Sequence, residues 1–184
     1  MSRSSARAGR NKAKQDKGDG ASVIDVELAL SRVIDGARAF SERKPLLIGI
    51  HTGGVWVAER VHEGLGLDEP LGTLDISFYR DDFSRVGIHP QVKTSHLPVP
   101  LDGRHIILID DVLHTGRTIR AAMNEIFDFA RPASIALAVL IVRDGRELPV
   151  QPDIAGATIS LRPWQHIKLT GPDPLGIRIM EKRE

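Results

Sequence analysis

Apolar and polar residues form two kinds of pattern along this chain, one typical of helices and the other of buried strands. Apolar residues recur at helical spacing over 26–40 and 119–130, and more weakly over 53–66, and Ser22 is the expected cap of the first helix. Short continuous apolar runs, the pattern of strands buried on both faces, occupy 45–50, 71–79, 104–110 and 134–142.

This alternation of helices and strands predicts an α/β fold with a mostly parallel central sheet flanked by helices. Such sheets bind ligands beyond the carboxyl ends of their strands, which is where the polar motifs of this chain stand. Residues 80–100 show no sustained periodicity. A loop of this length in a compact domain is typical of a lid over a site, or of an element that periodicity does not reveal.

Composition is typical of a globular protein, with 41% apolar and 27% charged residues. The 184 residues suffice for one domain with a core of its own. No apolar run approaches the roughly 18–20 residues of a membrane span, and the N-terminus lacks the apolar region of a secretory signal. The chain has no cysteine, which suits a cytoplasmic protein.

The net charge of +1 hides an asymmetry between the N-terminus and the rest. Residues 1–20 have a net charge of +4, which leaves −3 for residues 21–184. We expect a disordered, solvated tail over 1–20, because it lacks bulky aliphatic side chains, and one domain over 21–184. Since that domain is not basic overall, a nucleic-acid-binding face needs a local cluster of cations. Convergence on the face of a dimer is one way to form such a cluster from arginines that are scattered along the chain: Arg32, Arg38, Arg104, Arg131, Arg143 and Arg146.

The stretch HIILIDDVLHTGRT, residues 105–118, joins a predicted strand to a predicted helix. The first amides of a helix lack internal partners and carry the positive end of its dipole. In TGRT the threonines add hydroxyls, and the glycine lets the backbone come close to a ligand. Together these features suit a phosphate. Asp110 and Asp111, which end the strand, only accept hydrogen bonds when ionised and therefore suit vicinal hydroxyls. A phosphate beside a diol describes a ribose 5-phosphate. The alternative is that the two aspartates cap the helix or bind a metal.

The string ILIDDVLHTGRT resembles the phosphoribosyl pyrophosphate (PRPP) signature of the type I phosphoribosyltransferases. Three longer stretches resemble, more narrowly, bacterial uracil phosphoribosyltransferases that also regulate pyrimidine operons. These stretches are DISFYRDD (75–82), LDGRHIILIDDVLHTGRTIRAAM (101–123) and RPASIALAVLIVRDGRELPV (131–150). The resemblance covers roughly 21–180 and implies the type I phosphoribosyltransferase fold, with a flexible flap and a small hood beside the sheet.

The resemblance also implies roles for the signature residues. Asp110 and Asp111 are expected to bind the ribose hydroxyls, and Asp111 to stabilise the positive charge that develops as pyrophosphate leaves C1′ and uracil N1 attacks. The 5′-phosphate is expected on Thr115, Gly116, Arg117 and Thr118. Mg²⁺ is the expected cofactor, held mainly by substrate oxygens and neutralising the pyrophosphate.

Two further segments gain roles from the resemblance. YRDDF, residues 79–83, is expected to open the catalytic flap, with Arg80 on the pyrophosphate and Asp81 or Asp82 on Mg²⁺. RDGRELP, residues 143–149, is expected to contribute Arg143, Asp144 and Gly145 to the hood that binds uracil. A charged surface turn is the alternative for this second segment.

The loop after the strand at 45–50 departs from the family pattern. Related regulators typically read KTRG where this chain has His51, Thr52, Gly53 and Gly54. Backbone amides can still bind pyrophosphate, and the Thr52–Gly53 peptide is expected to be strained or cis, as in the family. The missing arginine beside a multiply charged leaving group predicts weak PRPP binding or slow turnover, and a Gly53→Arg variant is expected to be more active.

Two functions of different classes stay open at this point. One is an enzyme that makes UMP from uracil and PRPP. The other is a regulator that senses UMP or UTP in the same pocket and binds pyr leader mRNA, and the two are compatible. A purine phosphoribosyltransferase is a third interpretation, disfavoured because RDGRELP has no aromatic residue to stack on a purine. A homo-oligomer, dimer or tetramer, is expected in each case.

Overall fold

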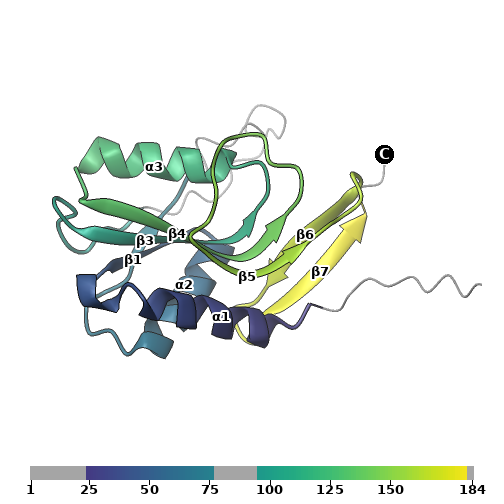
Figure 1. Ribbon diagram of the computed structural model, residues 1–184, viewed down its shortest axis with the longest axis horizontal. Coiled ribbons are helices and arrows are strands. Elements are labelled where there is room, and N and C mark those ends of the chain that lie inside the picture. Colours follow the sequence, from purple (N-terminus) through teal and green to yellow (C-terminus); the bar gives the residue numbers. More distant parts are fainter. Residues whose placement is uncertain (1–23, 77–94, 182–184) are drawn as a thin grey trace, which may run out of the picture.

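A computed structural model of the chain describes residues 24–76 and 95–181. Its centre is a five-stranded parallel sheet in the order β2-β1-β3-β4-β5 (Figure 1). The strands are β1 (Leu46–Ile50), β2 (Gly72–Leu74), β3 (His105–Leu113), β4 (Ser134–Arg143) and β5 (Ile154–Ile159). The predicted α/β fold with a parallel sheet is confirmed.

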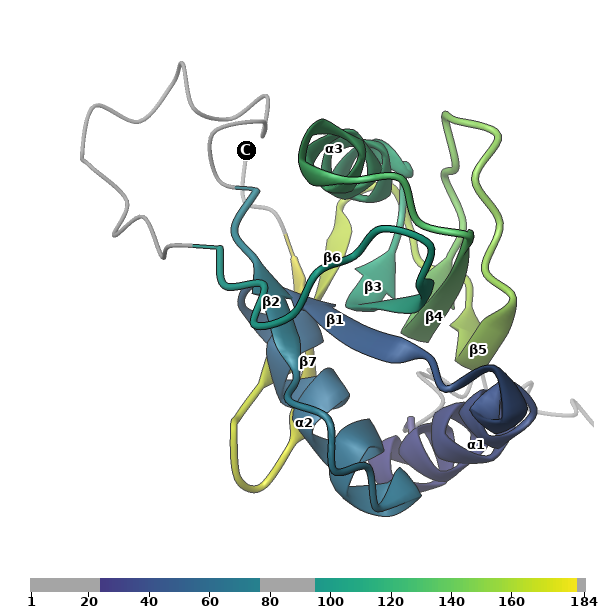
Figure 2. The ribbon, with the colours of Figure 1, turned by 90° about the vertical axis from the view of Figure 1, so that its left-hand side faces the viewer.

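Helices cover both faces of this sheet (Figure 2). Helices α1 (Val26–Arg38) and α2 (Gly53–Leu65) pack on one face and α3 (Arg117–Phe129) on the other, and a short 3-10 helix, η1 (Ser41–Arg43), follows α1. Each face has its own apolar core. One joins Val33 and Val57 to Ile107, and the other joins Ile126 to Ile48 and Leu108. β1 is buried along its whole length, as its continuous apolar run predicts.

Helix ends follow local chemistry. The carboxylate of Asp25 accepts the Leu28 amide at 2.9 Å, so the cap of α1 is Asp25 and the expected cap Ser22 is wrong; Ser22 itself lies outside the described residues. Gly66 ends α2 with φ 63°, a conformation that glycine adopts without strain.

Two strands differ in length from their prediction. β2 has three residues, and the rest of the predicted strand over 71–79 lies partly outside the described residues. β3 continues to Leu113, because β4 keeps pairing with it up to Leu113 opposite Val142. Pairing with β1 stops at Ile109. Asp110 and Asp111 therefore lie within the strand, on a part of β3 that has lost its β1 neighbour.

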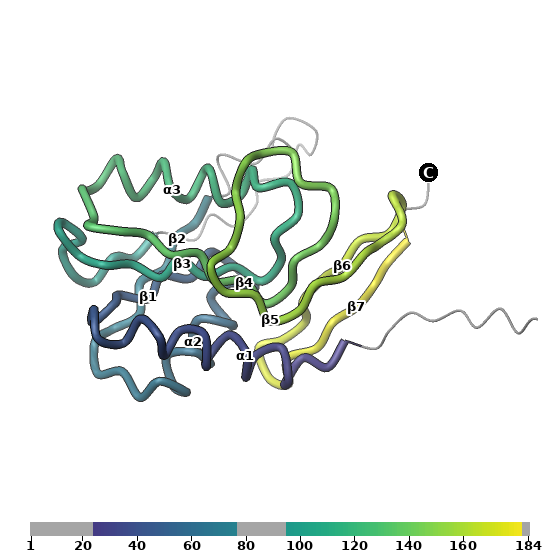
Figure 3. Tube along the Cα trace, viewed as in Figure 1, coloured from purple at the N-terminus to yellow at the C-terminus, as the bar shows by residue number. Residues whose placement is uncertain are grey.

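The C-terminal third holds three strands that periodicity did not reveal. Besides β5, strands β6 (Gln165–Thr170) and β7 (Gly176–Glu181) form an antiparallel ribbon beyond the end of the sheet (Figure 3). Their polar residues alternate with apolar ones and the segment is rich in glycine and proline, so no continuous apolar run marks it. We call this pair the β6–β7 ribbon.

Several expectations fall on segments outside the described residues. These are the tail over 1–20 and most of the expected flap, including Arg80, Asp81 and Asp82. The two ends of this gap lie side by side. Thr73 in β2 and His96 exchange two backbone hydrogen bonds of 2.8 Å. Within the described ranges, no helix has both the length and the apolar character that crossing a membrane requires.

Candidate functional site

The strand order creates one point where neighbouring loops diverge. From β1 the chain proceeds to β2 on one side, and from β3 it proceeds to β4 on the other. Parallel sheets form their ligand crevice at such a switch, outside the carboxyl ends of the two strands. The loop His51–Gly54 follows β1, and the segment Asp110–Thr118 covers the end of β3 and the start of α3. The fold thus brings together the two motifs that the sequence singled out.

The aspartate pair is held by its own backbone. Asp110 is 4% exposed, and its Oδ1 accepts the Asp111 amide at 3.0 Å. Oδ1 of Asp111, which is half-buried, accepts the Val112 amide at 3.0 Å. These bonds leave Oδ2 of Asp111 directed toward the β1 loop.

Two glycines let the β1 loop approach this pair. A Cβ atom on Gly53 would lie 2.2 Å from Asp111 Oδ2, and one on Gly54 would lie 2.6 Å from the Ile109 carbonyl oxygen and 2.9 Å from Asp110 Cα. Any side chain at either position would displace a neighbour. The backbone of the loop therefore lies directly against the aspartates.

The unusual peptide of the β1 loop is one residue earlier than expected. The His51–Thr52 bond is cis, so the expectation of a cis or strained Thr52–Gly53 peptide is wrong about its position. Thr52 precedes the first residue of α2 and makes no capping hydrogen bond with its side chain.

The segment after β3 forms a cradle at the start of α3. Gly116 has φ 91° and is buried, and Arg117 is the first helical residue. The Thr115 hydroxyl accepts the Arg117 amide at 3.3 Å, and its carbonyl accepts the amides of Glu147 and Leu148 at 3.0 Å each. The hood segment thus fixes the cradle, whose helix amides point outward with the positive end of the dipole.

Side chains in the cradle differ in their surroundings. The exposed Arg117 donates from Nε to Glu147 at 2.8 Å, an ion pair that holds the guanidinium over the hood segment. Thr118 is half-buried in the first turn of α3. TGRT therefore opens a helix, as predicted.

Arg143 and Asp144 both bond to residues outside the hood segment. Arg143 is 7% exposed and donates to the carbonyls of Gln165 at 3.0 Å and Asp144 at 3.3 Å. The Asp144 carboxylate accepts the Leu161 amide at 3.1 Å. Arg143 thus connects the end of β4 to the first residue of the β6–β7 ribbon, whereas Asp144 is exposed and bonds to the segment that precedes the ribbon.

His114 is a site residue to which the sequence analysis gave no role. It lies between the aspartates and TGRT, and Gly145, with φ 99°, would place a Cβ atom 2.7 Å from its Nε2. Burial, reinforced by the charge of Arg143, lowers the pKa of His114 below its ordinary 6.5, against the opposing pull of Glu147 and Asp144. Burial therefore favours the neutral form of this imidazole. The sequence feature that could have identified His114 is its position inside the string ILIDDVLHTGRT.

A cavity of about 350 Å³ adjoins this histidine. Its walls come from the end of β3, the hood segment and the end of β5: Leu113, His114, Val142, Arg143, Asp144, Gly145, Arg146, Thr158, Ile159 and Ser160. The cavity offers backbone groups, one imidazole and apolar carbons, the mixture that recognises a small planar heterocycle.

A second set of contacts that the sequence did not predict connects Ser95 to the end of β2 and to α3. The Asp75 amide donates to the Ser95 hydroxyl at 3.0 Å, and that hydroxyl donates to Glu125 Oε1 at 2.5 Å. Asp75 is buried at the end of β2. Nothing in the local sequence announces this contact, because its three members are distant in the chain.

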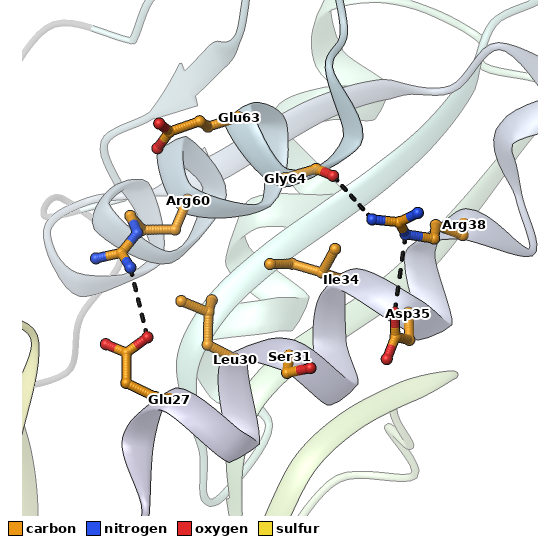
Figure 4. A pocket seen from close by; sticks show the side chains of 9 residues that line it. All are labelled: Glu27, Leu30, Ser31, Ile34, Asp35, Arg38, Arg60, Glu63 and Gly64. Carbon is orange, nitrogen blue, oxygen red and sulfur yellow. Dashed lines mark hydrogen bonds and ion pairs between the residues drawn. The ribbon is translucent and has the colours of Figure 1, made fainter.

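Another cavity, of about 400 Å³, lies between α1 and α2 (Figure 4). Its cations are engaged: Arg60 pairs with Glu27 at 3.5 Å, and Arg38 donates to the Gly64 carbonyl at 3.1 Å. It contains none of the residues of the loops after β1 and β3, so we do not include it in the candidate site.

Comparison with known proteins agrees with this geometry. Residues 19–169 match the phosphoribosyl transferase domain family. The chain is 60% identical to the bifunctional protein PyrR of Nitrosococcus oceani over 138 residues, which are 74% of this chain and 78% of that protein. It is 53% identical to the bifunctional protein PyrR of Pseudomonas putida over 155 residues, 84% of this chain and 86% of that one.

Solved structures agree at the level of the fold. The hypoxanthine phosphoribosyltransferase of Trypanosoma cruzi superposes with a TM-score of 0.59 at 19% identity, covering 85% of this chain and 93% of that chain. At this identity the likeness concerns the fold alone.

Proposed function

The chain belongs to the phosphoribosyltransferase family and, within it, to the PyrR proteins, and we propose that it converts uracil and PRPP to UMP and pyrophosphate and also regulates pyrimidine genes in response to uridine nucleotides. The observation that carries the catalytic half is the contact of the glycine loop after β1 with the Asp110–Asp111 pair, at the switch point and beside the cradle of α3.

The proposed orientation of PRPP follows from the chemistry of these residues. Asp110 and Asp111 accept the two ribose hydroxyls, because ionised carboxylates are pure acceptors. The 5′-phosphate lies on the amides and hydroxyls of Thr115–Thr118, at the positive end of the α3 dipole. The pyrophosphate then lies toward His51–Gly54, whose backbone approaches Asp111.

The reaction breaks the C1′–oxygen bond, and pyrophosphate leaves with the bonding electrons. Uracil N1 forms the new bond to C1′, and its proton passes to the departing pyrophosphate or to water. Asp111 lies beside the sugar and stabilises the positive charge that the ring develops between these events. Its hydrogen bond from the Val112 amide holds the carboxylate in place beforehand.

Magnesium suits the donors present. Among the described residues, no three His, Asp or Glu side chains gather to hold a metal ion, but Asp111 presents one carboxylate oxygen toward the β1 loop. A hard cation of this kind is held by one or two carboxylates with substrate phosphates and water. When bound, Mg²⁺ neutralises the charge of the departing pyrophosphate. Asp81 and Asp82, proposed as further ligands, and Arg80, proposed to contact the pyrophosphate, lie outside the described residues.

The uracil ring is proposed to enter the cavity beside His114 and Gly145. Backbone groups of 143–149 can provide a donor for each carbonyl and an acceptor for N3–H. Arg143 acts indirectly, since its guanidinium is bonded to Gln165 and Asp144. It positions the segment that would contact the base.

Turnover is proposed to be slow, because the β1 loop lacks the arginine of related regulators. Gly53 allows close backbone approach but adds no charge beside the pyrophosphate. The fold and the glycines keep the loop in the place where pyrophosphate binds, so binding through amides alone is preserved at lower affinity.

A substrate comparison tests the catalytic half. The full chain is incubated with PRPP, Mg²⁺ and either uracil or hypoxanthine, and the nucleotide formed is measured. We expect UMP from uracil and no more than a trace of product from hypoxanthine. Product from hypoxanthine at an equal or greater rate would contradict the proposal and favour a purine enzyme.

The regulatory half uses the same pocket as a sensor. A ribose phosphate site that binds PRPP also binds UMP or UTP, because each contains the diol and the phosphate. We propose that nucleotide occupancy alters binding of pyr mRNA, and that the protein acts in the cytoplasm as a homo-oligomer. Binding of labelled leader RNA with and without UMP tests this half, and RNA affinity that does not respond to UMP contradicts it.

A further inference from the structure

The β6–β7 ribbon has two unlike faces, and the proposed reaction uses neither. Ile167, Leu169 and Ile177 share one face and pack against the core that includes α1 and α2. The opposite face, which we call the outward face, pairs His166 with Met180 and Lys168 with Arg178. All four of these side chains are exposed.

The outward face contains an unfavourable charge pair. Lys168 lies directly opposite Arg178, and like charges in that position destabilise an antiparallel pair. Within 24–76 and 95–181, no carboxylate forms an ion pair with either side chain. The strand register puts Glu181 on the other face, opposite Gln165. The repulsion is therefore not relieved by the described part of the chain, and a bound polyanion would relieve it.

An aromatic platform stands at the entry to β6. Trp164 is 49% exposed, and the Arg162 guanidinium lies 5.7 Å from the centroid of its ring. The indole and guanidinium planes are both surfaces on which unpaired bases stack. The combination of spaced cations with an exposed aromatic residue is typical of surfaces that bind single-stranded nucleic acid.

The arginines that looked scattered in the sequence are already engaged within the fold. Each donates to an acceptor within the fold: Arg32 to Gly156, Arg38 to Gly64, Arg104 to Glu69, Arg131 to Phe127, Arg143 to Gln165 and Arg146 to Val150. Lys168 and Arg178 have no such acceptor among the described residues. The outward face is thus a place where two cations are available to a ligand, and it lies beside an exposed indole.

The ribbon is also connected to the candidate site. Arg143, at the end of β4, donates to the Gln165 carbonyl at 3.0 Å, so β6 begins beside the segment proposed to bind uracil. A change in that segment can reach the first residue of the ribbon through one hydrogen bond. This connection suits a surface whose affinity is to respond to a bound nucleotide.

We propose that the outward face of the β6–β7 ribbon binds a single-stranded segment of RNA, with Lys168 and Arg178 on its phosphates and Trp164 stacked on an unpaired base. The proposal rests on the regulatory half of the proposed function and gives it a location. An acidic protein would use the cations alone, whereas a polynucleotide uses the cations and the aromatic platform together.

The test measures RNA binding by the full chain with three variants. The probe is a fluorescein-labelled single-stranded RNA of about 16 nucleotides, the upper end of usual site sizes, with purines and pyrimidines mixed. Affinity is measured by anisotropy from about 50 to about 200 mM salt. The variants are Trp164→Ala, the double variant Lys168→Ser/Arg178→Ser, and the charge-matched control Arg43→Ser/Arg60→Ser.

The proposal predicts a different signature for each. Removing Lys168 and Arg178 should reduce the slope of log affinity against log salt by about 1.4, the contribution of two phosphate contacts to a single strand. Trp164→Ala should weaken binding about 5- to 150-fold at every salt concentration without changing the slope. The control removes the same charge elsewhere and should leave affinity and slope unchanged.

UMP synthesis by each variant, measured in parallel, reports that the chain is folded and tests the catalytic half separately. Ribbon variants that bind the probe as the wild type does would overturn the ribbon proposal while RNA binding itself stands. A wild-type chain that does not bind the probe at the lowest salt would overturn the ribbon proposal and remove support from the regulatory half, without touching the catalytic one.

Discussion

The two loops that meet at the switch point contact their proposed ligands by different means. The loop after β3 uses side chains and support: the Thr115 hydroxyl accepts a helix amide, and its carbonyl is fixed by two amides of the hood segment. The loop after β1 uses the absence of side chains, because Gly53 and Gly54 bring its backbone against the aspartates. The loop after β3 therefore depends on particular hydrogen-bonding groups, whereas the loop after β1 depends on the absence of a side chain at Gly53 and Gly54.

Filling the space at Gly54 should have the largest effect. In Gly54→Ala the new Cβ meets the Ile109 carbonyl oxygen at 2.6 Å and Asp110 Cα at 2.9 Å, and both are backbone atoms that cannot turn away. We expect a loss of stability of about 1–3 kcal/mol, and a fall in kcat/KM of about 100-fold, because a small displacement of reacting groups is costly. Thermal unfolding and UMP synthesis measure the two.

Gly64→Ala is the matched control within the same helix. Its Cβ would meet the Ile34 side chain, 2.8 Å from Cδ1 and 3.2 Å from Cγ1 and Cγ2, and no backbone atom. We expect nearly wild-type activity from this variant. If Gly54→Ala behaves like Gly64→Ala, the close packing of the β1 loop is not needed.

Substitutions at Gly53 separate space from charge. Gly53→Ala directs a Cβ at Asp111 Oδ2. The displaced carboxylate would lose a hydrogen bond to the substrate, and because a hydrogen bond to a charged group contributes about 1.5 kcal/mol or more, we expect activity to fall about tenfold. The melting temperature should change little, because the displaced atoms belong to a side chain. Gly53→Arg carries the same Cβ and adds a cation toward the pyrophosphate. We expect its KM for PRPP to lie below that of Gly53→Ala.

Equal KM values in the two Gly53 variants would show that a cation at this position contributes nothing here. An arginine variant more active than the wild type would show that slow turnover comes from the missing charge. Steady-state kinetics with varied PRPP distinguish these results.

Thr115 tests the other loop. Thr115→Ala removes the hydroxyl that accepts the Arg117 amide and that we place on the 5′-phosphate, so KM for PRPP should rise about fivefold to tenfold, the worth of roughly 1 kcal/mol. Thr115→Ser keeps the hydroxyl and should restore KM. Failure of serine to restore it would mean that the methyl group, and not the hydroxyl, matters.

The smallest effect concerns pH and His114. Burial lowers the pKa of His114 in the folded chain, while unfolding returns it to the ordinary 6.5. Below pH 6.5 the unfolded chain therefore binds a proton that the folded chain does not, and stability falls until pH reaches the lowered pKa. The stability contributed by the neutral imidazole is present above pH 6.5 and is lost as pH decreases.

His114→Gln should accordingly show a shallower fall in melting temperature than the wild type between about pH 7.5 and about pH 5. The exposed His96 provides the control variant His96→Gln, for which the wild-type slope is expected. An unchanged slope in His114→Gln would show that its burial does not favour the neutral form.

The contrast between the loops also explains what the sequence could reveal. A strand, two aspartates, TGRT and an amphipathic helix are local features, and the structure has them in that order along β3 and α3. The distance from Gly53 to Asp111 depends on the register of β1 against β3, with Gly49 opposite Ile109, which no local pattern contains. The same holds for the Ser95 and Glu125 contact.

The C-terminal ribbon was missed for a different reason. Only one face of β6 and β7 is packed, so apolar residues such as Ile167 and Leu169 alternate with exposed His166 and Lys168 instead of forming a run. In the hood segment, the resemblance implied a role for Arg143 and Asp144, but no local pattern contains the partner of Arg143. Its guanidinium donates to the Gln165 carbonyl, because a buried polar group needs a partner that only the tertiary fold supplies.

The most direct measurement of the central claim is steady-state UMP formation from uracil and labelled PRPP with Mg²⁺, in the wild type and in Asp111→Asn. We expect UMP from the wild type and a loss of about 100-fold or more in the variant, because the amide cannot stabilise the charge that develops on the ribose. Asp111→Asn that forms UMP at the wild-type rate would contradict the account. It would mean that the aspartate pair of β3 is not the ribose site.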